Sequence, residues 1–453
     1  MKIAGLDIGT SKICGLVLDT GTGDVASVAT ESNPGSIASA GPGEALQDPD
    51  RLASIAEAIL QQFRRRFPDV RAVGVTGQMH GILYVDAKGK ALGPLYTWQD
   101  GRGDRELSPG LTYAKHLSGR LGRAVSTGMG FVTHYYNTRA GLVPGDAASL
   151  CTAADYVALR LAKARAPVMD ASNAAGLGCF DLAVGDFRRS LMAELNVDPA
   201  VFPPVSAGYP ALGEAAPGVP VYAALGDNQA SFMGSVREAH SSVLVNIGTG
   251  SQVSIFTKTP ADSSLVDARP FPFGGFLAVG AGLCGGRACA LLRSFFERTV
   301  RLFGGGSGGA GWDVMNGVGE QGLGAERLTI DTRFAGTRHD PLARGSVHNL
   351  GAATFTPEHM IAGVREGIAG ELMGFYDAFP AEARGQVTSL VGSGNGLRLN
   401  PALRLVCERR FGMPMVVPAH AEEAAFGAAL LAGVAGGALS DLAAAGRLIR
   451  YGA

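Results

Sequence analysis

Two stretches of the chain carry the same short pattern: LDIGTSKICGLVL at residues 6–18 and VNIGTGSQVSIF at residues 245–256. Each has an apolar approach, then Ile-Gly-Thr, a small polar tip and an exit in which apolar residues alternate. Alternation near period two, rich in Ile, Val and Leu, predicts two paired strands joined by a tight turn. A single Gly-Thr turn would indicate only a turn, but two copies with matched strands predict a chain built from two similar halves.

The tips of these hairpins have the composition of an anion-binding turn. Small residues let the backbone turn tightly and leave N–H groups facing outward, and a threonine hydroxyl adds a further donor. The two copies differ where one has Asp7 and the other Asn246. A carboxylate suits a magnesium-bound triphosphate, whereas a second carboxylate would repel the phosphates. The pair therefore predicts a clamp for a phosphate chain, formed by Gly9, Thr10 and Ser11 in one copy and by Gly248 and Thr249 in the other.

The overall composition narrows the class of protein. The chain has 453 residues, enough for two or three domains, and is 46% hydrophobic with a formal net charge of -1. This balance does not indicate nucleic acid or a lipid surface as a partner. The six cysteines form no CxxC pair, the eight histidines form no metal motif, and no run of about 18 apolar residues occurs. The N-terminus lacks a signal-peptide core, so a cytoplasmic protein is expected.

The order of the other elements predicts an α/β fold. Apolar residues at helical spacing predict helices at 50–67, 288–303 and 357–379, and strand patterns occur at 70–78 and 219–226. Strands and helices alternate again at 387–434. Such alternation predicts sheets covered by helices, in domains of residues 1–235 and 236–453 with the boundary between Ser231 and Ser241. The glycine-rich run at 304–311 contains a formal GxGxxG, but no strand precedes it, so it is interpreted as a flexible loop.

Asp227 is the candidate catalytic residue. It lies in ALGDNQAS, at the end of an apolar strand and the start of an expected helix, where α/β folds place working groups. A lone aspartate in this position is often a helix N-cap. Because it lies about 20 residues before the second hairpin, we interpret it as a base that accepts the proton of a hydroxyl attacking a γ-phosphate.

Two polar stretches suggest a site for a polyhydroxylated ligand. TGQMHGI places Gln78 and His80 after a strand, and both side chains can donate and accept hydrogen bonds. YTWQDGRGD adds Trp98, whose indole could pack against a sugar ring, and Asp100. The simpler alternatives are a locally satisfied histidine in a turn and a surface pair of Asp100 with Arg102, which would contribute little.

LVGSGNGLRLNP runs from a strand through glycines to a helix that should begin near Asn400. Gly392, Gly394 and Gly396 would allow close approach to a planar ligand such as adenine, although glycine loops between strand and helix are common. The chain has no GxxxxGK[ST] loop, so the common mononucleotide motif is absent.

Taken in order, these segments resemble the signatures of the FGGY carbohydrate kinases: DIGTSK, GQMHG, GDNQ and NIGTG, followed by VGSGNG…NP and AEEAAFGAALLAG. GQMHG resembles the ketose-kinase branch. TWQDGR, DASNAAGLGCFD and GLCGGRACALL are similar to kinases of a seven-carbon ketose. The resemblance spans essentially the whole chain. It implies the duplicated actin/hexokinase/heat-shock-type (ribonuclease H-like) ATPase fold, with mixed sheets, helices on both faces and ligands between the domains.

The resemblance also implies roles for individual residues. Asp227 would activate a primary hydroxyl of the sugar, and Asp7 would lie near Mg²⁺. Thr10 and Thr249 would lie at the β- and γ-phosphates of ATP. One departure is that the first loop, GTSKI, is a residue shorter than is usual in the family, which leaves the roles of Ser11 and Lys12 open. The sugar site would include Met79, His80, Asp100 and Asn228, and the nucleoside site Gly286, Gly394 and Asn400.

The expected reaction is ATP-dependent phosphorylation of a ketose. Sedoheptulose is the favoured substrate, and xylulose, ribulose or another polyol are the alternatives. A nucleotide- or sugar-binding protein of the same fold without catalysis is the contrasting class, and the two acids Asp7 and Asp227 argue against it. A homodimer is expected only because dimers are the commonest soluble homo-oligomers.

Overall fold

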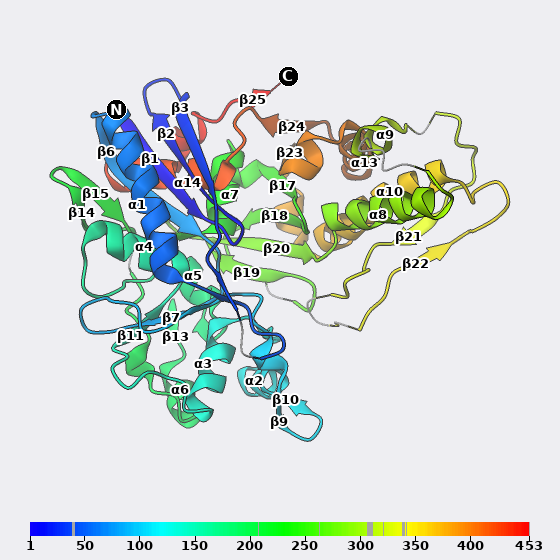
Figure 1. The fold of residues 1–453 in the computed structure, drawn as a ribbon. Coiled ribbons are helices and arrows are strands. Elements are labelled where there is room, and N and C mark those ends of the chain that lie inside the picture. The colour runs from blue at the N-terminus through cyan, green and yellow to red at the C-terminus, as the bar shows by residue number, and fades with distance from the viewer. Residues whose placement is uncertain are drawn as a thin grey trace. The chain divides into compact units, whose positions relative to one another are not determined.

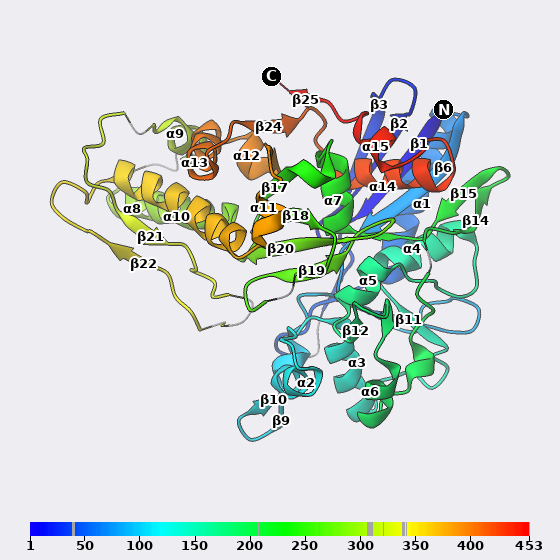
Figure 2. The ribbon, with the colours of Figure 1, turned by 180° about the vertical axis from the view of Figure 1, so that it is seen from behind.

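The computed structural model describes residues 1–38, 41–206, 208–261, 263–305, 311–319, 321–337, 340 and 342–452. Its chain divides into two compact units. The first consists of Met1–Arg237, Arg269–Gly275 and Glu422–Arg450, and the second of Glu238–Ala268, Phe276–Ala421 and Tyr451–Ala453. Each unit contains a seven-stranded sheet with helices packed on it (Figures 1 and 2).

The sheet of the first unit is built around the first repeated hairpin. The strands on either side of its turn pair antiparallel, with Asp7 opposite Cys14 and Ile8 opposite Ile13. The strand order is β14-β15-β6-β1-β2-β3, with β16 also paired to β6. The bounds are β1 (Lys2–Ile8), β2 (Lys12–Asp19), β3 (Val25–Ser32), β6 (Val70–Gly77), β14 (Ala211–Ala216), β15 (Val219–Tyr222) and β16 (Leu225–Gly226).

Helices lie on both faces of this sheet. On one face, α1 (Pro49–Arg66) begins after the N-cap Asp48, which accepts from two backbone N–H groups, and it buries Ile59 and Phe63. The arginines of QQFRRRF lie in its last turn, where cations are favourable. With α4 (Ala153–Ala162) it covers this face, while α14 (Glu423–Ala435) packs on β1 and β6 and on α7 (Asp227–Ser235).

Most of the remaining elements of the first unit lie between β3 and α1 and in the long connection between β6 and β14. They include a small sheet of β4 (Ser36–Ile37), β5 (Leu46–Gln47) and β8 (Leu95–Tyr96). A second small sheet pairs β7 (Leu83–Val85) with β11 (Ser149–Cys151). The other bounds are β9 (Glu106–Ser108), β10 (Leu111–Thr112), α2 (Tyr113–Leu121), α3 (Gly130–Arg139), α5 (Ala171–Gly176), β12 (Phe180–Asp181), β13 (Asp186–Phe187) and α6 (Arg189–Glu194).

The second unit repeats the arrangement around the second hairpin. Its order is β19-β20-β18-β17-β23-β24-β25. In both sheets a central antiparallel hairpin is flanked by an antiparallel strand on one side and a parallel strand on the other: β3-β2-β1-β6 corresponds to β20-β18-β17-β23. The bounds are β17 (Ser242–Ile247), β18 (Ser251–Thr257), β19 (Asp267–Pro270), β20 (Phe276–Gly282), β23 (Ser389–Ser393), β24 (Met415–Pro418) and β25 (Tyr451–Gly452). The predicted duplicated α/β fold is confirmed.

The helices expected in the second half are present. They are α8 (Gly286–Leu302), α10 (Pro357–Asp377) and, between β23 and β24, α12 (Asn395–Arg398) and α13 (Pro401–Phe411). A short helix α9 (Gly311–Gly317) and a hairpin of β21 (Thr329–Asp331) and β22 (Ser346–His348) complete this part. In the glycine-rich run interpreted as a loop, residues 306–310 lie outside the described residues. As expected, the element that precedes the run is not a strand; it is the helix α8.

The two units do not follow a single division of the chain. Domains of residues 1–235 and 236–453 were predicted from the sequence, whereas α14 and the segment Arg269–Gly275 pack with the first unit. The physical reason is close packing on small residues. A Cβ on Gly5 would lie 1.9 Å from the carbonyl oxygen of Ala425, and one on Gly74 would lie 1.9 Å from that of Ala428.

Candidate active site

The register of the first sheet brings together the two acids that the sequence singled out. β1 and β16 both run parallel to β6, which lies between them. Asp7 pairs with Thr76 in this register, and Gly226 pairs with Gly77. The carboxyl ends of the three strands therefore meet at one edge of the sheet, where Asp227 follows directly after β16. The interpretation of Asp227 as an N-cap does not hold, because Gly226 occupies that position and Asp227 is the first residue of α7.

Asp7 lies in an electrostatically unfavourable place for a carboxylate. Burial first, and then the negative charges of Asp227 and Glu422, raise its pKa to about 7, while the charge of Lys12 acts in the opposite direction. The Lys12 ammonium donates to both carboxylate oxygens of Glu422 at 2.8 Å. Asp7 thus lies in the field of two other carboxylates and of the Lys12 ammonium, and a bound cation would favour its ionised form.

This donor set fits a magnesium ion that is held mainly by water and substrate phosphates. Mg²⁺ prefers carboxylate oxygens and usually keeps several waters, so one or two protein ligands suffice. Among the described residues no group of three or more His, Cys, Asp or Glu side chains could by itself hold a metal ion. Asp7 is therefore a candidate ligand for a substrate-associated cation rather than part of a complete protein cage.

Side chains from several loops hold the tip of the first hairpin. The Thr10 hydroxyl accepts from the indole Nε1 of Trp98 at 3.0 Å and donates to Oε1 of Gln78 at 3.3 Å. The Thr10 carbonyl accepts from Nδ2 of Asn33 and Nε2 of Gln47. Two residues predicted for the sugar, Gln78 and Trp98, therefore contact Thr10, which was predicted for the phosphates.

The other residues predicted for the sugar lie around the end of β6. His80 has a left-handed backbone with φ of 74°, and its Nδ1 lies 2.7 Å from the carbonyl oxygen of Gly176. Met79 is buried, and its sulfur would lie 2.7 Å from a Cβ on Gly226. Asn228 is buried on the first turn of α7, and its Oδ1 finds no hydrogen-bond partner within the described chain. An unpaired buried amide oxygen is a suitable acceptor for a ligand hydroxyl.

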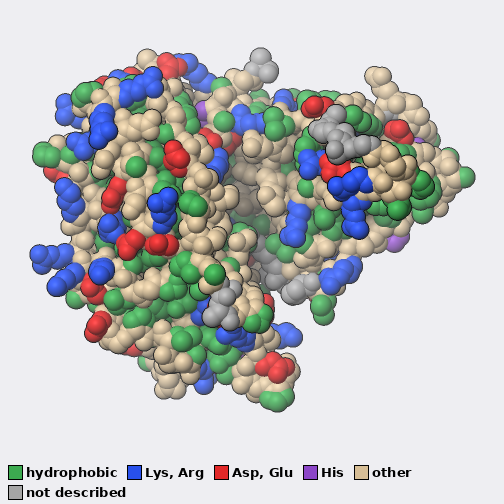
Figure 3. Space-filling view, viewed as in Figure 1, with side chains coloured by type: hydrophobic (Ala, Val, Ile, Leu, Met, Phe, Trp, Pro, Cys, Tyr) green, Lys and Arg blue, Asp and Glu red, His purple; other side chains and the backbone are tan. Residues whose placement is uncertain are grey.

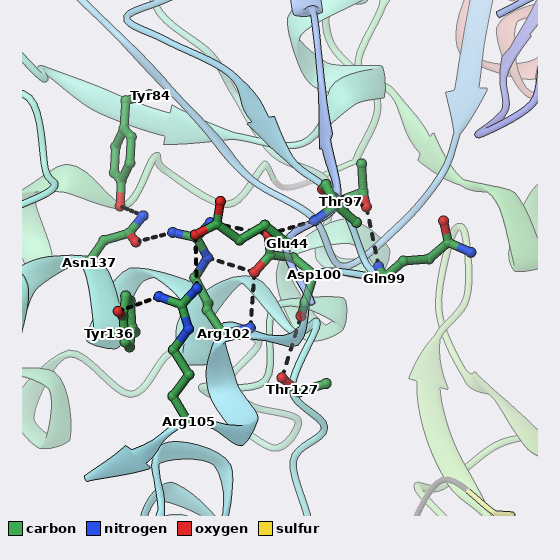
Figure 4. Close-up of polar contacts among 11 residues, drawn as sticks. Glu44, Tyr84, Thr97, Gln99, Asp100, Arg102, Arg105, Thr127, Tyr136 and Asn137 are labelled. Carbon is green, nitrogen blue, oxygen red and sulfur yellow. Dashed lines mark hydrogen bonds and ion pairs between the residues drawn. The ribbon is translucent and has the colours of Figure 1, made fainter. Parts of the chain in front are cut away.

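Asp100 is buried in a network rather than paired at the surface, so the surface-pair alternative is wrong. Its side chain is 0% exposed, and Arg102 donates to both of its carboxylate oxygens (Figure 4). The backbone N–H of Ala45 donates to Oδ2 at 3.1 Å. On its other side the Arg102 guanidinium donates to Asn137 at 2.8 Å. This network fixes the loop that carries Trp98, whose side chain is 43% exposed.

In the second unit, the start of α8 is bonded to the tip of the second hairpin. The N–H of Gly286 donates to the carbonyl of Gly248, and that of Arg287 donates to the carbonyl of Thr249, both at 2.9 Å. A Cβ on Gly286 would lie 2.5 Å from the Gly248 carbonyl oxygen. The absence of a side chain at Gly286 therefore permits this contact. It brings Gly286, which was predicted at the nucleoside, next to Gly248, which was predicted at the phosphates.

The glycines of LVGSGNG make close contacts within the protein. Gly394 has a φ of +83°, and a Cβ there would lie 2.5 Å from the carbonyl oxygen of Ile247 and 3.1 Å from Oδ1 of Asn246. Asn400 caps α13 by accepting from the N–H of Leu403 at 3.0 Å. It also lines a cavity of about 10 Å³ together with Trp312. Gly394 therefore lies against the strand that leads into the second hairpin, whereas Asn400 lies at the start of α13.

A larger cavity of about 1080 Å³ lies elsewhere in the second unit, between α10, β20 and the β21–β22 hairpin. None of the predicted site residues lines it. Three of its arginines are engaged with acids, Arg333 with Asp331 and both Arg409 and Arg410 with Glu366. We therefore do not assign this cavity to the nucleotide.

The sequence interpretation missed several residues that support the site. Glu422 lies in AEEAAFGAALLAG, but nothing in that stretch indicates that it pairs with Lys12, 410 positions away. Asn33 and Gln47 occur in polar segments without a recognisable pattern, and only the fold brings their amides to Thr10. The ion pair with Glu422 gives Lys12, a residue of the shortened loop, a role in holding the first hairpin in place. Ser11 is exposed, and its carbonyl accepts from the N–H of Asn33.

A duplicated α/β fold with a glycine-threonine turn in each sheet and an aspartate at the strand ends is typical of an ATP-using phosphotransferase. Residues 2–234 match the N-terminal domain of the FGGY family of carbohydrate kinases, and residues 243–436 match its C-terminal domain. The chain therefore belongs to the FGGY family of carbohydrate kinases and is a kinase enzyme.

Individual relatives agree with this assignment. A sedoheptulokinase of Mus musculus is 28% identical over 433 residues, covering 86% of this chain and 87% of that protein. The sedoheptulokinase of Homo sapiens is 27% identical with the same coverage. Among solved structures, xylulose kinase from Rhodospirillum rubrum aligns with a TM-score of 0.85 at 22% identity, over 100% of this chain and 93% of that one, which shows the shared fold.

No helix within the described residues is long and apolar enough to span a membrane. Basic and acidic side chains are interspersed over the surface of the first unit that Figure 3 shows. This mixture agrees with the small net charge, and substrates are expected to be recognised by local groups rather than by a surface field of one sign.

Proposed function

We propose that this kinase transfers the γ-phosphate of ATP to a primary hydroxyl of sedoheptulose, forming sedoheptulose 7-phosphate. The observation that carries the chemistry is the alignment of Asp7 and Asp227 at one edge of the first sheet. The similarity to sedoheptulokinases along 86% of the chain supports the choice of sugar.

In this reaction Asp227 accepts the proton of the sugar hydroxyl as that oxygen attacks the γ-phosphorus. The bond from the γ-phosphorus to the bridging oxygen breaks, and ADP leaves with that oxygen. Phosphoryl transfer depends mainly on positioning and on neutralising charge. Mg²⁺ beside Asp7 would supply part of that neutralisation when it is bound with ATP.

The proposed contacts follow the geometry of each unit. Gly9, Thr10 and Ser11 of the first hairpin and Gly248 and Thr249 of the second bind phosphate oxygens through N–H groups and hydroxyls. Gly286, Gly394 and Asn400 surround the nucleoside. His80, Trp98 and Asn228 contact the sugar, with Met79 forming an apolar wall. Gln78 and Asp100 act by holding Thr10 and the Trp98 loop, because their polar atoms are already bonded within the protein.

The test of substrate choice is ADP release with Mg-ATP and a panel of sedoheptulose, xylulose, ribulose, fructose and glycerol. We expect kcat/KM for sedoheptulose to exceed the others by about ten-fold or more, a transition-state preference of about 1.4 kcal/mol. A larger kcat/KM for xylulose would change the substrate to a pentulose. ADP release that no sugar of the panel increases would contradict the proposed function.

A further inference from the structure

The stretch DASNAAG, residues 170–176, lies close to the proposed base although it carries none of the chemistry assigned so far. It forms the short helix α5, with Asp170 as its N-cap. α5 packs against β16, the strand that ends directly before Asp227. Asp170, Ser172 and Asn173 are all buried. Burial of three polar side chains is favourable only where they are bonded, so their partners indicate what they do.

Ser172 connects α5 to the backbone at Asp227. Its hydroxyl accepts from the N–H of Gly226 at 2.9 Å and donates to the carboxylate of Asp170. That carboxylate also accepts from the backbone N–H of Ser172 at 2.8 Å and from the hydroxyl of Tyr209. The bond to Asp170 therefore fixes the direction of the Ser172 hydroxyl. Its oxygen then accepts from the N–H of Gly226, the residue before Asp227.

Two further side chains hold the preceding peptide groups. The hydroxyl of Thr76 on β6 donates to the carbonyl of Leu225 at 2.8 Å. The amide of Asn173 donates to the carbonyl of Ala224 at 3.3 Å. Three consecutive residues before Asp227 are thus bonded by buried side chains from β6 and α5, in addition to the pairing of β16 with β6.

The N-cap position of α7 adds no side-chain capping bond to these contacts. Gly226, which occupies that position, has no side chain. The backbone of residues 224–226, which these three side chains hold, therefore sets where Asp227 begins α7 and contributes to the direction of its side chain. A displacement of about 1 Å can lower a rate by about 10²-fold when the reacting atoms must be aligned.

We infer that Ser172, oriented by Asp170, and Thr76 are positioning residues for Asp227: they fix the backbone before the base and thereby its alignment with the sugar hydroxyl. This inference rests on the proposed function, since it requires Asp227 to act as the base. Neither residue contacts substrate in this account, so their loss should affect turnover through Asp227 alone.

The test is a double-mutant cycle of Ser172→Ala with Asp227→Asn, measured with Mg-ATP and the preferred ketose. We expect Ser172→Ala to lower kcat about 10-fold while KM for ATP changes less than about two-fold. In the Asp227→Asn background the same substitution should change kcat less than about two-fold, because alignment of an absent base has no effect. Thr76→Val, which removes the other hydroxyl with little change of shape, should behave in the same way.

Ser235→Ala is the matched control, because the Ser235 hydroxyl is also buried on α7 but has no hydrogen-bond partner in the described structure. Its kcat should equal that of the unmodified enzyme. Unchanged kcat in both Ser172→Ala and Thr76→Val would overturn the inference, as would an equal loss in both backgrounds. These outcomes are distinct from failure of the proposed function, which would appear as near-normal kcat in Asp227→Asn alone.

Discussion

The two copies of the hairpin differ at the residue before Ile-Gly-Thr, which is Asp7 in one and Asn246 in the other. Burial and the charges of Asp227 and Glu422 raise the pKa of Asp7 to about 7. Keeping this buried carboxylate ionised costs free energy, and a bound cation would offset that cost. At the equivalent position of the second copy, Asn246 provides hydrogen bonding without charge, and its Oδ1 lies close to the Gly394 backbone.

Reciprocal substitutions test this difference. Asp7→Asn should raise the Mg²⁺ concentration needed for half-maximal turnover by about 10-fold or more, because a candidate ligand of the cation is lost. Asn246→Asp should instead raise KM for ATP about 10-fold through repulsion of the phosphates. Titrations of turnover with Mg²⁺ and with ATP separate the two effects. An unchanged Mg²⁺ requirement in Asp7→Asn would contradict its assignment.

His134 makes a prediction for stability at acid pH. It is buried, with its Nδ1 2.9 Å from the Tyr84 hydroxyl, and burial lowers its pKa to about 4. The unfolded chain binds a proton near pH 6.5 and the folded protein only near pH 4, so this residue's contribution is present above pH 6.5 and is lost as pH falls toward 4. The loss reaches about 2–3 kcal/mol. His134→Gln should lose correspondingly less stability between pH 7 and pH 4.5 in urea unfolding, and an equal loss in both proteins would contradict this.

Among the elements, the crossing of α7 and α14 depends most directly on glycine. A Cβ on Gly427 would lie 1.9 Å from the carbonyl oxygen of Ala230, and one on Gly234 would lie 1.9 Å from that of Glu423. The backbones of the two helices therefore touch, which couples the helix that begins with the proposed base to a helix from the C-terminal part of the chain.

A pair of alanine substitutions checks this contact. Gly427→Ala should destabilise the protein by about 2 kcal/mol or more, because the added methyl group overlaps a backbone oxygen. Gly370→Ala on α10 is the matched control, since nothing lies within 4 Å of its added Cβ. It should stabilise by about 0.5–1 kcal/mol through helix propensity. Thermal unfolding of both variants measures the difference, and similar shifts would contradict the close contact.

Local patterns predicted most elements, because hairpins and amphipathic helices are encoded by residues close together in the chain. They could not predict how distant side chains pair. Trp98 and Gln78 were expected at a sugar and Thr10 at a phosphate, yet their mutual hydrogen bonds join positions 88 and 68 residues apart. Likewise, whether Asp100 and Arg102 form a surface pair or a buried one depends on β5, α3 and the loops around them, which the two residues themselves do not encode.

At the scale of the whole molecule, duplication is visible in both the sequence and the order of strands in the two sheets. The return of α14 to the first unit was not predicted, since an apolar helix near the C-terminus can cover any sheet. Its close contacts with Gly5 and Gly74 show why it packs on β1 and β6. The strand that carries Asp7 and the helix that begins with Asp227 thus share one supporting element.

Removal of divalent cations tests the account of the intact enzyme. With excess EDTA we expect sugar-dependent ADP release to fall to background, because the charges of the triphosphate and of Asp7 are then uncompensated. Addition of Mg²⁺ above the chelator concentration should restore it. Full activity in EDTA would show that Asp7 is not part of a cation site.

We propose Asp227 as the base in phosphoryl transfer from ATP to the ketose. The most direct measurement compares kcat and KM for ATP in the unmodified enzyme and in Asp227→Asn, with formation of the sugar phosphate followed directly. We expect Asp227→Asn to lower kcat by about 10² or more and to leave KM for ATP within about two-fold, because a general base is lost. Sugar phosphate formed at a near-normal rate by Asp227→Asn would contradict it.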